Sequence, residues 1–257
     1  MSPARSWTVA AVVPLAAGAF LALGGHLSPV ARASVPAGPP VFSNPTSFSN
    51  AFFPFEAGAF RVFTGKSDGA PIVVIDVFTS DTRDFSWGGG TVTCRVLQET
   101  EFEDGELVEI SLNYFAQAND GSVYYFGEVV DDYEDGVVVD HDGSWLVGGP
   151  TGGDPPETDS VDDPALFMPA NPEVGDEWMP EDVPDGPQEL DRLTRTDVRV
   201  KCPTGRYEGC IEVLETDVAD GATEKKWYAP GVGVCKGKAQ GENFKLVATT
   251  FRPVEAD

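Results

Sequence analysis

The chain has 257 residues, with 42 Asp and Glu against 17 Lys and Arg, and a formal net charge of −25 at pH 7. This balance excludes binding to nucleic acid through phosphate neutralisation, which needs a basic face, and it disfavours an anionic membrane surface. Because 41% of the residues are hydrophobic, the chain can bury a core and is not globally disordered. We expect one acidic globular domain.

Residues 1–33 have the three parts of a secretory signal peptide. They are a short basic start, an uncharged apolar stretch over residues 7–27, and the small-x-small motif Ala31-Arg32-Ala33. Pro14 and several glycines interrupt the apolar stretch, which disfavours a permanent anchor. We expect cleavage after Ala33, no integral membrane span afterwards, and a secreted, periplasmic or cell-envelope protein. Loss of Arg5 and Arg32 takes the net charge from −25 to −27.

Residues 34–55, rich in Pro, Ser, Asn and Phe without periodicity, predict a poorly ordered lead-in to a single β domain over 56–257. Within that domain an Asp-Gly dipeptide, which supplies the positive φ that two-residue hairpin turns need, occurs seven times. Val108, Ile110 and Leu112 alternate with polar residues, as in a half-buried strand. Strands are expected over 60–64, 72–78, 92–96, 108–116, 123–130, 136–139, 145–147, 198–202, 210–215, 225–228 and 244–251.

Residues 150–187 contain nine prolines and many acids, so they predict a long loop that cannot continue a strand ladder. Apolar residues at 165–170 and Trp178-Met179 favour packing of this loop against the sheet. The fold class expected is all-β: an antiparallel meander that closes into an open barrel or a sandwich, with a long Pro-rich acidic loop.

The four cysteines, Cys94, Cys202, Cys210 and Cys235, predict two disulfides in an exported chain, with three pairings open. A zinc site is the alternative, but no C-x2-C pair is present. Gly65-Lys66-Ser67-Asp68-Gly69 matches a nucleophile elbow, yet a strand rather than a helix follows it, so a hairpin turn is favoured.

One acidic cluster combines the oxygen ligands that calcium takes. It lacks the complete calcium-loop pattern, so hairpin turns are the favoured interpretation and any calcium binding is expected to be weak; no other cofactor is expected. The cluster consists of Asp131, Asp132, Glu134, Asp140 and Asp142.

Five ordered strings carry a resemblance to a family: VYYFGEVVDDYEDG, HDGSW, FMPANPEVGDEW, GRYEGCIEVLET and KKWYAPGVGV. They resemble uncharacterised bacterial secreted or envelope-associated β-rich proteins with a YYAPGVGLV-type C-terminal signature. The resemblance implies an open-barrel-like fold and export. It supplies no catalytic residue that could be carried over to this chain. Cysteine is uncommon in that family at Cys202 and Cys235, which implies an added disulfide between them and pairs Cys94 with Cys210 as the second choice.

Two functions remain open. The first is a non-catalytic ligand-binding or interaction module for a small molecule or an extracellular partner, whose groove is lined by aromatic residues. The second is a carboxylate-dependent extracellular hydrolase acting on carbohydrate. A hydrolase predicts a cleft with two facing carboxylates, one with a raised pKa; a binder predicts an apolar cavity. The aromatic candidates are Tyr114, Tyr125, Trp145, Trp227 and Tyr228.

Overall fold

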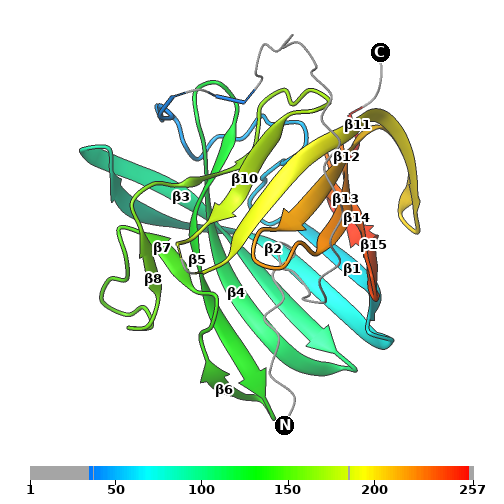
Figure 1. The fold of residues 1–257 in the computed structure, drawn as a ribbon, viewed down its shortest axis with the longest axis horizontal. Helices are drawn as coiled ribbons and strands as arrows, with labels where there is room; N and C mark the ends of the chain where they lie inside the picture. The colour runs from blue at the N-terminus through cyan, green and yellow to red at the C-terminus, as the bar shows by residue number, and fades with distance from the viewer. Residues whose placement is uncertain (1–34, 37, 185, 255–257) are drawn as a thin grey trace, which may run out of the picture.

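The computed structural model describes residues 35–36, 38–184 and 186–254, and these contain strands and loops but no helix. Each expected strand has a counterpart (Figure 1). The strands are β1 (Phe60–Ser67), β2 (Ala70–Trp87), β3 (Gly90–Glu103), β4 (Glu106–Gln117), β5 (Val123–Glu134), β6 (Val137–Asp140), β7 (Trp145–Val147), β8 (Asp159–Val161), β9 (Ala165–Met168), β10 (Glu177–Asp182), β11 (Gln188–Cys202), β12 (Gly205–Asp217), β13 (Thr223–Ala229), β14 (Gly233–Ala239) and β15 (Glu242–Thr249).

All the described strands belong to one sheet, in the order β10-β11-β12-β13-β14-β15-β1-β2-β3-β4-β5-β7-β8, with β6 and β9 also paired to β5. Neighbours are antiparallel except β7 and β8, which are parallel. The all-β prediction is therefore confirmed. The predicted hairpin turns are present at Asp68-Gly69, Asp104-Gly105 and Asp135-Gly136, where the aspartates have φ between 48° and 52° and the glycines are also positive.

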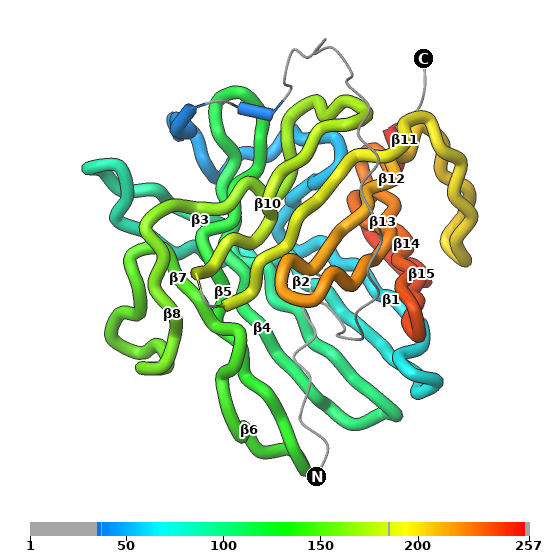
Figure 2. The backbone as a smooth tube through the Cα atoms, in the orientation of Figure 1, coloured from blue at the N-terminus to red at the C-terminus, as the bar shows by residue number. Residues whose placement is uncertain are grey.

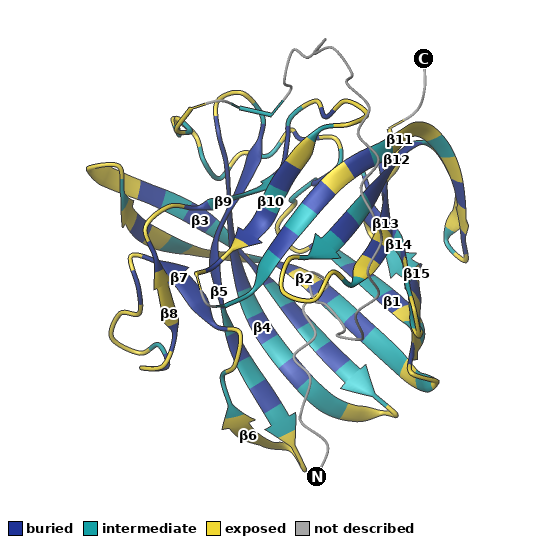
Figure 3. Cartoon of the chain, in the orientation of Figure 1, coloured by how far each residue is buried: buried dark blue, intermediate teal, exposed yellow. Residues whose placement is uncertain are grey.

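The sheet curls on itself but does not close into a barrel. Its β10 edge lies beside β9 and β5, and within the described ranges β10 forms a backbone ladder only with β11. The indole of Trp178 on β10 donates a hydrogen bond to the carbonyl of Phe167 on β9, at 3.1 Å. We call this junction the seam. Over Glu109–Asn113 of β4 and Glu128–Tyr133 of β5, buried and less buried residues alternate, with the buried ones on the concave face of the curled sheet, while the adjoining ends of both strands are buried on both faces (Figure 3).

The predicted loop over 150–187 differs from expectation, because it contains β8, β9 and β10. Proline is compatible with these strands because it lies at an edge or beside a strand end. Pro180 lies in the edge strand β10, where the register with β11 shifts between Trp178 and Glu181. The loop is packed against the sheet through β9, whose Met168 pairs with Val123 on β5.

The segment before β1 packs phenylalanines against the sheet. Phe42 contacts Tyr124 and Phe126, and Phe53 lies 4.7 Å from Phe115, measured between ring centroids. The side-chain amide of Gln117 on β4 accepts hydrogen bonds from the backbone of Ser49 and Asn50. The expected signal peptide lies outside the described residues. Among those described there is no long apolar helix of the kind that crosses a membrane.

The β11–β12 hairpin is long and bent, with three register shifts along its ladder. Figure 2 shows it as the yellow arm that curves away from the body and turns back. Near its tip, the thiol of Cys202 donates to the carbonyl of Cys235 on β14, at 3.1 Å. The bend therefore gives the hairpin a second point of contact with the sheet.

Candidate functional site

Acidic side chains line the concave face of the sheet, which we call the inner face. Twelve of the described Asp and Glu residues are buried. Strand register places all of them on the inner face except Glu212, which bonds the outer-face residues Lys225 and Trp227. The inner-face set consists of Asp76, Glu99, Glu101, Glu109, Glu128, Asp132, Glu181, Glu189, Asp191, Glu215 and Glu224.

Two buried cations face this acidic lining. Arg61 on β1 binds Asp76 through two nitrogens, Nε and Nη2, each 2.7 Å from Oδ2. Lys226 on β13 lies 2.7 Å from Glu215 and 3.8 Å from Glu224. These two cations cannot neutralise all the carboxyl groups of the inner face, so charge balance there requires bound protons or a further cation.

Burial raises the pKa of several of these groups. For Glu181, loss of solvation followed by repulsion from Glu215 raises the pKa to about 7. The pKa of Glu224 rises to about 8, because the loss of solvation on burial outweighs the attraction of Lys226. The pKa values of Glu189 and Asp191 also rise well above their usual range, through burial and then the charge of Glu215. Part of the inner face is therefore uncharged at neutral pH.

Two of the carboxyl groups meet at the seam. Glu128 is on β5 and Glu181 is on β10, and both side chains are buried. Burial and then repulsion from Glu181 raise the pKa of Glu128 well above its ordinary value. Among the described residues β10 has no backbone ladder to β5, so this pair of side chains is part of the contact between the two edges.

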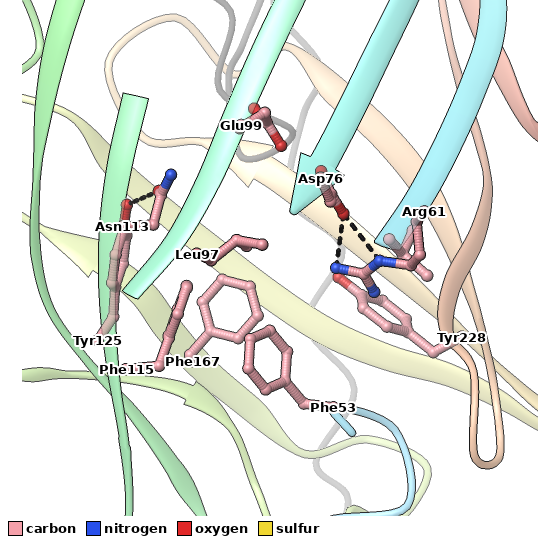
Figure 4. A pocket seen from close by; sticks show the side chains of 11 residues that line it. Phe53, Arg61, Asp76, Leu97, Glu99, Asn113, Phe115, Tyr125, Phe167 and Tyr228 are labelled. Atoms are coloured by element: carbon pink, nitrogen blue, oxygen red, sulfur yellow. Dashed lines mark hydrogen bonds and ion pairs between the residues drawn. The ribbon is translucent and has the colours of Figure 1, made fainter. Parts of the chain in front are cut away.

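A small, partly open cavity of about 40 Å³ lies at the inner face (Figure 4). One side of it is polar, with the carboxyl groups of Asp76 and Glu99 on neighbouring strands. Asn113 lies beside them and accepts a hydrogen bond from the Tyr125 hydroxyl. The opposite side is aromatic or aliphatic. The full lining is Phe53, Arg61, Asp76, Leu97, Glu99, Asn113, Phe115, Tyr125, Phe167, Tyr228 and Val234.

The five predicted aromatic residues are all buried, and the structure brings only Tyr125 and Tyr228 to this cavity. Tyr114 packs against Phe85 and the Arg83 guanidinium. Trp227 lies on the outer face, under Lys236. Trp145 contacts Tyr125 and borders an open groove of about 800 Å³ beside β9 and β10. Tyr114 and Trp227 therefore serve mainly in packing, whereas Trp145 also lines the groove.

The predicted acidic cluster is split between the two faces of its hairpin. Asp132 points to the inner face, where burial and the neighbouring Asp140 raise its pKa to about 8. Asp131 instead lies 2.9 Å from His141. Within the part of the chain that the structure describes, no group of three or more His, Cys, Asp or Glu residues is placed to hold a metal ion. Glu134 is the last residue of β5, beside the hairpin turn, and Asp142 lies in the turn that follows β6.

The predicted disulfides are absent: all four cysteines are buried free thiols. Cys202, Cys210 and Cys235 are neighbours, and the Cys235 thiol interacts with the other two. Cys94 lies apart on β3, near Arg83 and Asp84, so its expected pairing with Cys210 is wrong. The curvature of β11 and β12 that gathers the other three was not visible in their spacing.

Sequence reasoning missed the acidic inner face. The sequence contained a pattern that could have revealed it. Glu189, Asp191 and Leu193 are spaced two residues apart and therefore share one face of a strand. The same is true of Glu109, Ser111 and Asn113. Their acidity suggested a solvated face. The structure shows that this shared face is the buried one.

No family model matches the chain, and no curated protein matches it. Among solved structures, the chain is similar to a protein from Parabacteroides distasonis described as a "putative lipoprotein". The TM-score is 0.43 and the identity 12%, over 79% of this chain and 100% of that chain. This distant similarity supports no conclusion about function.

Proposed function

We propose that this protein is an exported, non-catalytic binding protein that holds a small ligand in the cavity of its inner face. The observation that carries the proposal is the cavity itself. It is small and largely buried, its aromatic side faces the carboxyl groups of Asp76 and Glu99, and Tyr125 is held by a hydrogen bond to Asn113. Concave sites with apolar walls and a few convergent polar groups are typical of ligand recognition. Export rests on the signal-peptide pattern of residues 1–33.

The hydrolase alternative has one feature in its favour, since buried carboxyl groups with raised pKa values face one another on the inner face. Glycoside hydrolysis also requires a sugar ring and a water between the two groups. Glu128 and Glu181 are in direct side-chain contact, which leaves no space for a sugar ring between them. The cavity of about 40 Å³, which neither of them lines, also has no room for a sugar ring. The geometry therefore favours binding of a much smaller molecule.

The proposal is tested by native mass spectrometry of the mature protein recovered from the exporting cell. We expect a retained small ligand, released on unfolding. Leu97→Phe should fill the cavity and abolish retention, because Leu97 lines it. Leu112→Phe is the matched control, since Leu112 lies next to Asn113 on β4 and points to the other face. Equal retention by both variants would place the ligand elsewhere and refute the proposal.

A further inference from the structure

We propose that Cys202, Cys210 and Cys235 form a redox-active site that reversibly stores one disulfide, with Cys235 as the common partner of the other two. The oxidant is a low-molecular-weight disulfide. The pairing that forms decides whether the tip of the β11–β12 hairpin is fixed covalently to the sheet. This inference goes beyond the proposed ligand binding and does not depend on it.

The cluster forms because the end of β11 bends back and lies beside β14 and β15. Cys202 is the last residue of β11, Cys210 lies in β12 and Cys235 lies in β14. Their exposures are 5%, 0% and 0%. The Cys235 thiol contacts both of the other thiols. Because one sulfur forms only one disulfide, the cluster holds a single disulfide and leaves the third cysteine as a thiol.

Backbone groups of the sheet position two of the three sulfurs. The Cys202 thiol donates a hydrogen bond to the carbonyl of Cys235 at 3.1 Å, and the Cys235 thiol donates to the carbonyl of Trp227 on β13 at 3.3 Å. Disulfide formation requires two sulfurs that are already close and suitably oriented. The docked hairpin tip therefore brings Cys202 to its partner.

Cys202 is the thiol that reacts first. Its bond with Cys235 lowers the pKa of Cys202, and the charges of Lys236 and Lys245 act in the same direction against the effect of burial. A lower thiol pKa increases the fraction of thiolate, which is the nucleophile. Cys202 also lies between the exposed residues Lys201 and Pro203, so a small movement of the tip opens it to a reagent.

The tip is held to the body by few polar contacts, which favours such a movement. Besides the bond made by Cys202, the hydroxyl of Thr204 donates to the carbonyl of Leu246 on β15 at 3.4 Å. Figure 2 shows the arm curving away from the body before it turns back. Cys94 has no such access, because it is 0% exposed in the middle of β3.

Oxidation proceeds by two thiol–disulfide exchanges. The Cys202 thiolate attacks one sulfur of the reagent RS–SR, so the bond from Cys202 Sγ to SR forms and RS⁻ leaves, taking up the proton that Cys202 lost. Cys235 Sγ then attacks Cys202 Sγ, and the second RS⁻ leaves with the proton of Cys235. Two protein thiols are oxidised, and one reagent disulfide is reduced to two RSH molecules.

A third exchange moves the disulfide without further oxidant. Cys210 Sγ attacks Cys235 Sγ, the Cys210–Cys235 bond forms, and Cys202 leaves as a thiol with the proton of Cys210. The Cys202–Cys235 disulfide links the hairpin tip to β14, whereas the Cys210–Cys235 disulfide leaves the tip to its noncovalent contacts. The two pairings therefore give a fixed arm and a releasable arm.

The test begins with the mature protein, fully reduced, freed of reductant and exposed under native conditions to glutathione disulfide. We expect the loss of two of the four thiols, counted by alkylation and mass spectrometry, and one disulfide per chain. Trypsin cleaves after Lys201, Arg206 and Lys226 and so places the three clustered cysteines on separate peptides. Peptide mapping should find Cys235 in every disulfide and Cys94 alkylated.

Cysteine variants separate the roles. Cys94→Ser is the matched control and should still form one disulfide at the wild-type rate, as should Cys210→Ser. Cys235→Ser should form no intramolecular disulfide. Cys202→Ser should form the disulfide about tenfold more slowly, because only the two fully buried thiols remain. In hydrogen exchange, oxidation should protect residues 201–206 in Cys210→Ser and leave them unchanged in Cys202→Ser.

Four remaining thiols in native wild-type protein, under conditions that oxidise the urea-unfolded chain, would overturn the inference. A disulfide that includes Cys94, or one between Cys202 and Cys210, would also overturn it. These results come from the wild-type protein and do not require that any variant folds. Equal rates for wild type and Cys202→Ser would refute the role of Cys202 as the first thiol.

Discussion

Replacing Glu181 by Gln should stabilise the protein at alkaline pH and change little at acidic pH. Glu181 is 2% exposed and lies at the seam beside Glu128. Its pKa is about 7 in the folded protein against an ordinary value of 4.5. The unfolded chain therefore releases this proton at a lower pH than the folded protein does. Stability from the neutral group is complete below the unfolded value and is lost as the pH rises through about 7.

The size of the effect follows from the same pKa values. At about 1.4 kcal/mol per pKa unit, the rise from 4.5 to about 7 corresponds to roughly 3 kcal/mol. Gln is uncharged and close to isosteric with the protonated acid, so it avoids this cost. Relative to wild type, the variant should gain little at pH 5 and about 3 kcal/mol in free energy of unfolding at pH 8.

The assay is urea unfolding of both proteins from pH 5 to pH 9, starting above the isoelectric point near 4.2 to keep the protein soluble. Glu106→Gln, on an exposed turn, serves as the control and should show no pH-dependent difference. A Glu181→Gln protein that is less stable than wild type at pH 8, or a difference that does not vary with pH, would refute the assignment of Glu181 as a buried acid with a raised pKa.

Three further outcomes are expected. Lys226→Met leaves Glu215 and Glu224 without their buried cation and should cost about 3–5 kcal/mol at pH 7 in urea unfolding; a loss no larger than that of Lys225→Met, its exposed neighbour, would contradict this. Gly65→Ala places a Cβ 1.8 Å from the backbone oxygen of Asn243 and should lower the melting temperature, unlike Gly38→Ala, which meets nothing within 4 Å. Millimolar calcium should raise the melting temperature no more than sodium at equal ionic strength, because the 131–142 cluster is split; a selective calcium effect would show a real site.

The hairpins were predictable because their information is local. Asp-Gly at 68–69, 104–105 and 135–136 supplies the positive φ of the turns, and alternation along β4 defines which residues share a face. The strands within 150–187 were not predicted, because their prolines hide the alternating pattern; β9 pairs with the distant β5, and β10 pairs with the following strand β11. The hydrogen bonds of these ladders hold the segment in strands, although its prolines interrupt the alternating sequence pattern that predicts a strand.

The candidate site was predictable only in part. Tyr125 and Tyr228 were selected as aromatic candidates, and both line the cavity. Asp76 and Glu99 were missed because acidic residues are usually solvated. Alternation shows that residues share a face, but the curvature of the whole sheet decides which face is enclosed. That curvature comes from long-range pairing and is not written in any short segment.

The pairing of β1 with β15 has a consequence for how the chain matures. Arg61 pairs with Thr249, so β15, which follows all the other described strands in the sequence, lies in the middle of the sheet, between β14 and β1. During synthesis the two arms of the sheet cannot join until this strand leaves the ribosome, and such distant pairing is slow to form. Until then the sheet has two open edges, one at β14 and one at β1. Removing the C-terminal strand would divide the sheet at its centre, whereas loss of β10 would only shorten its edge.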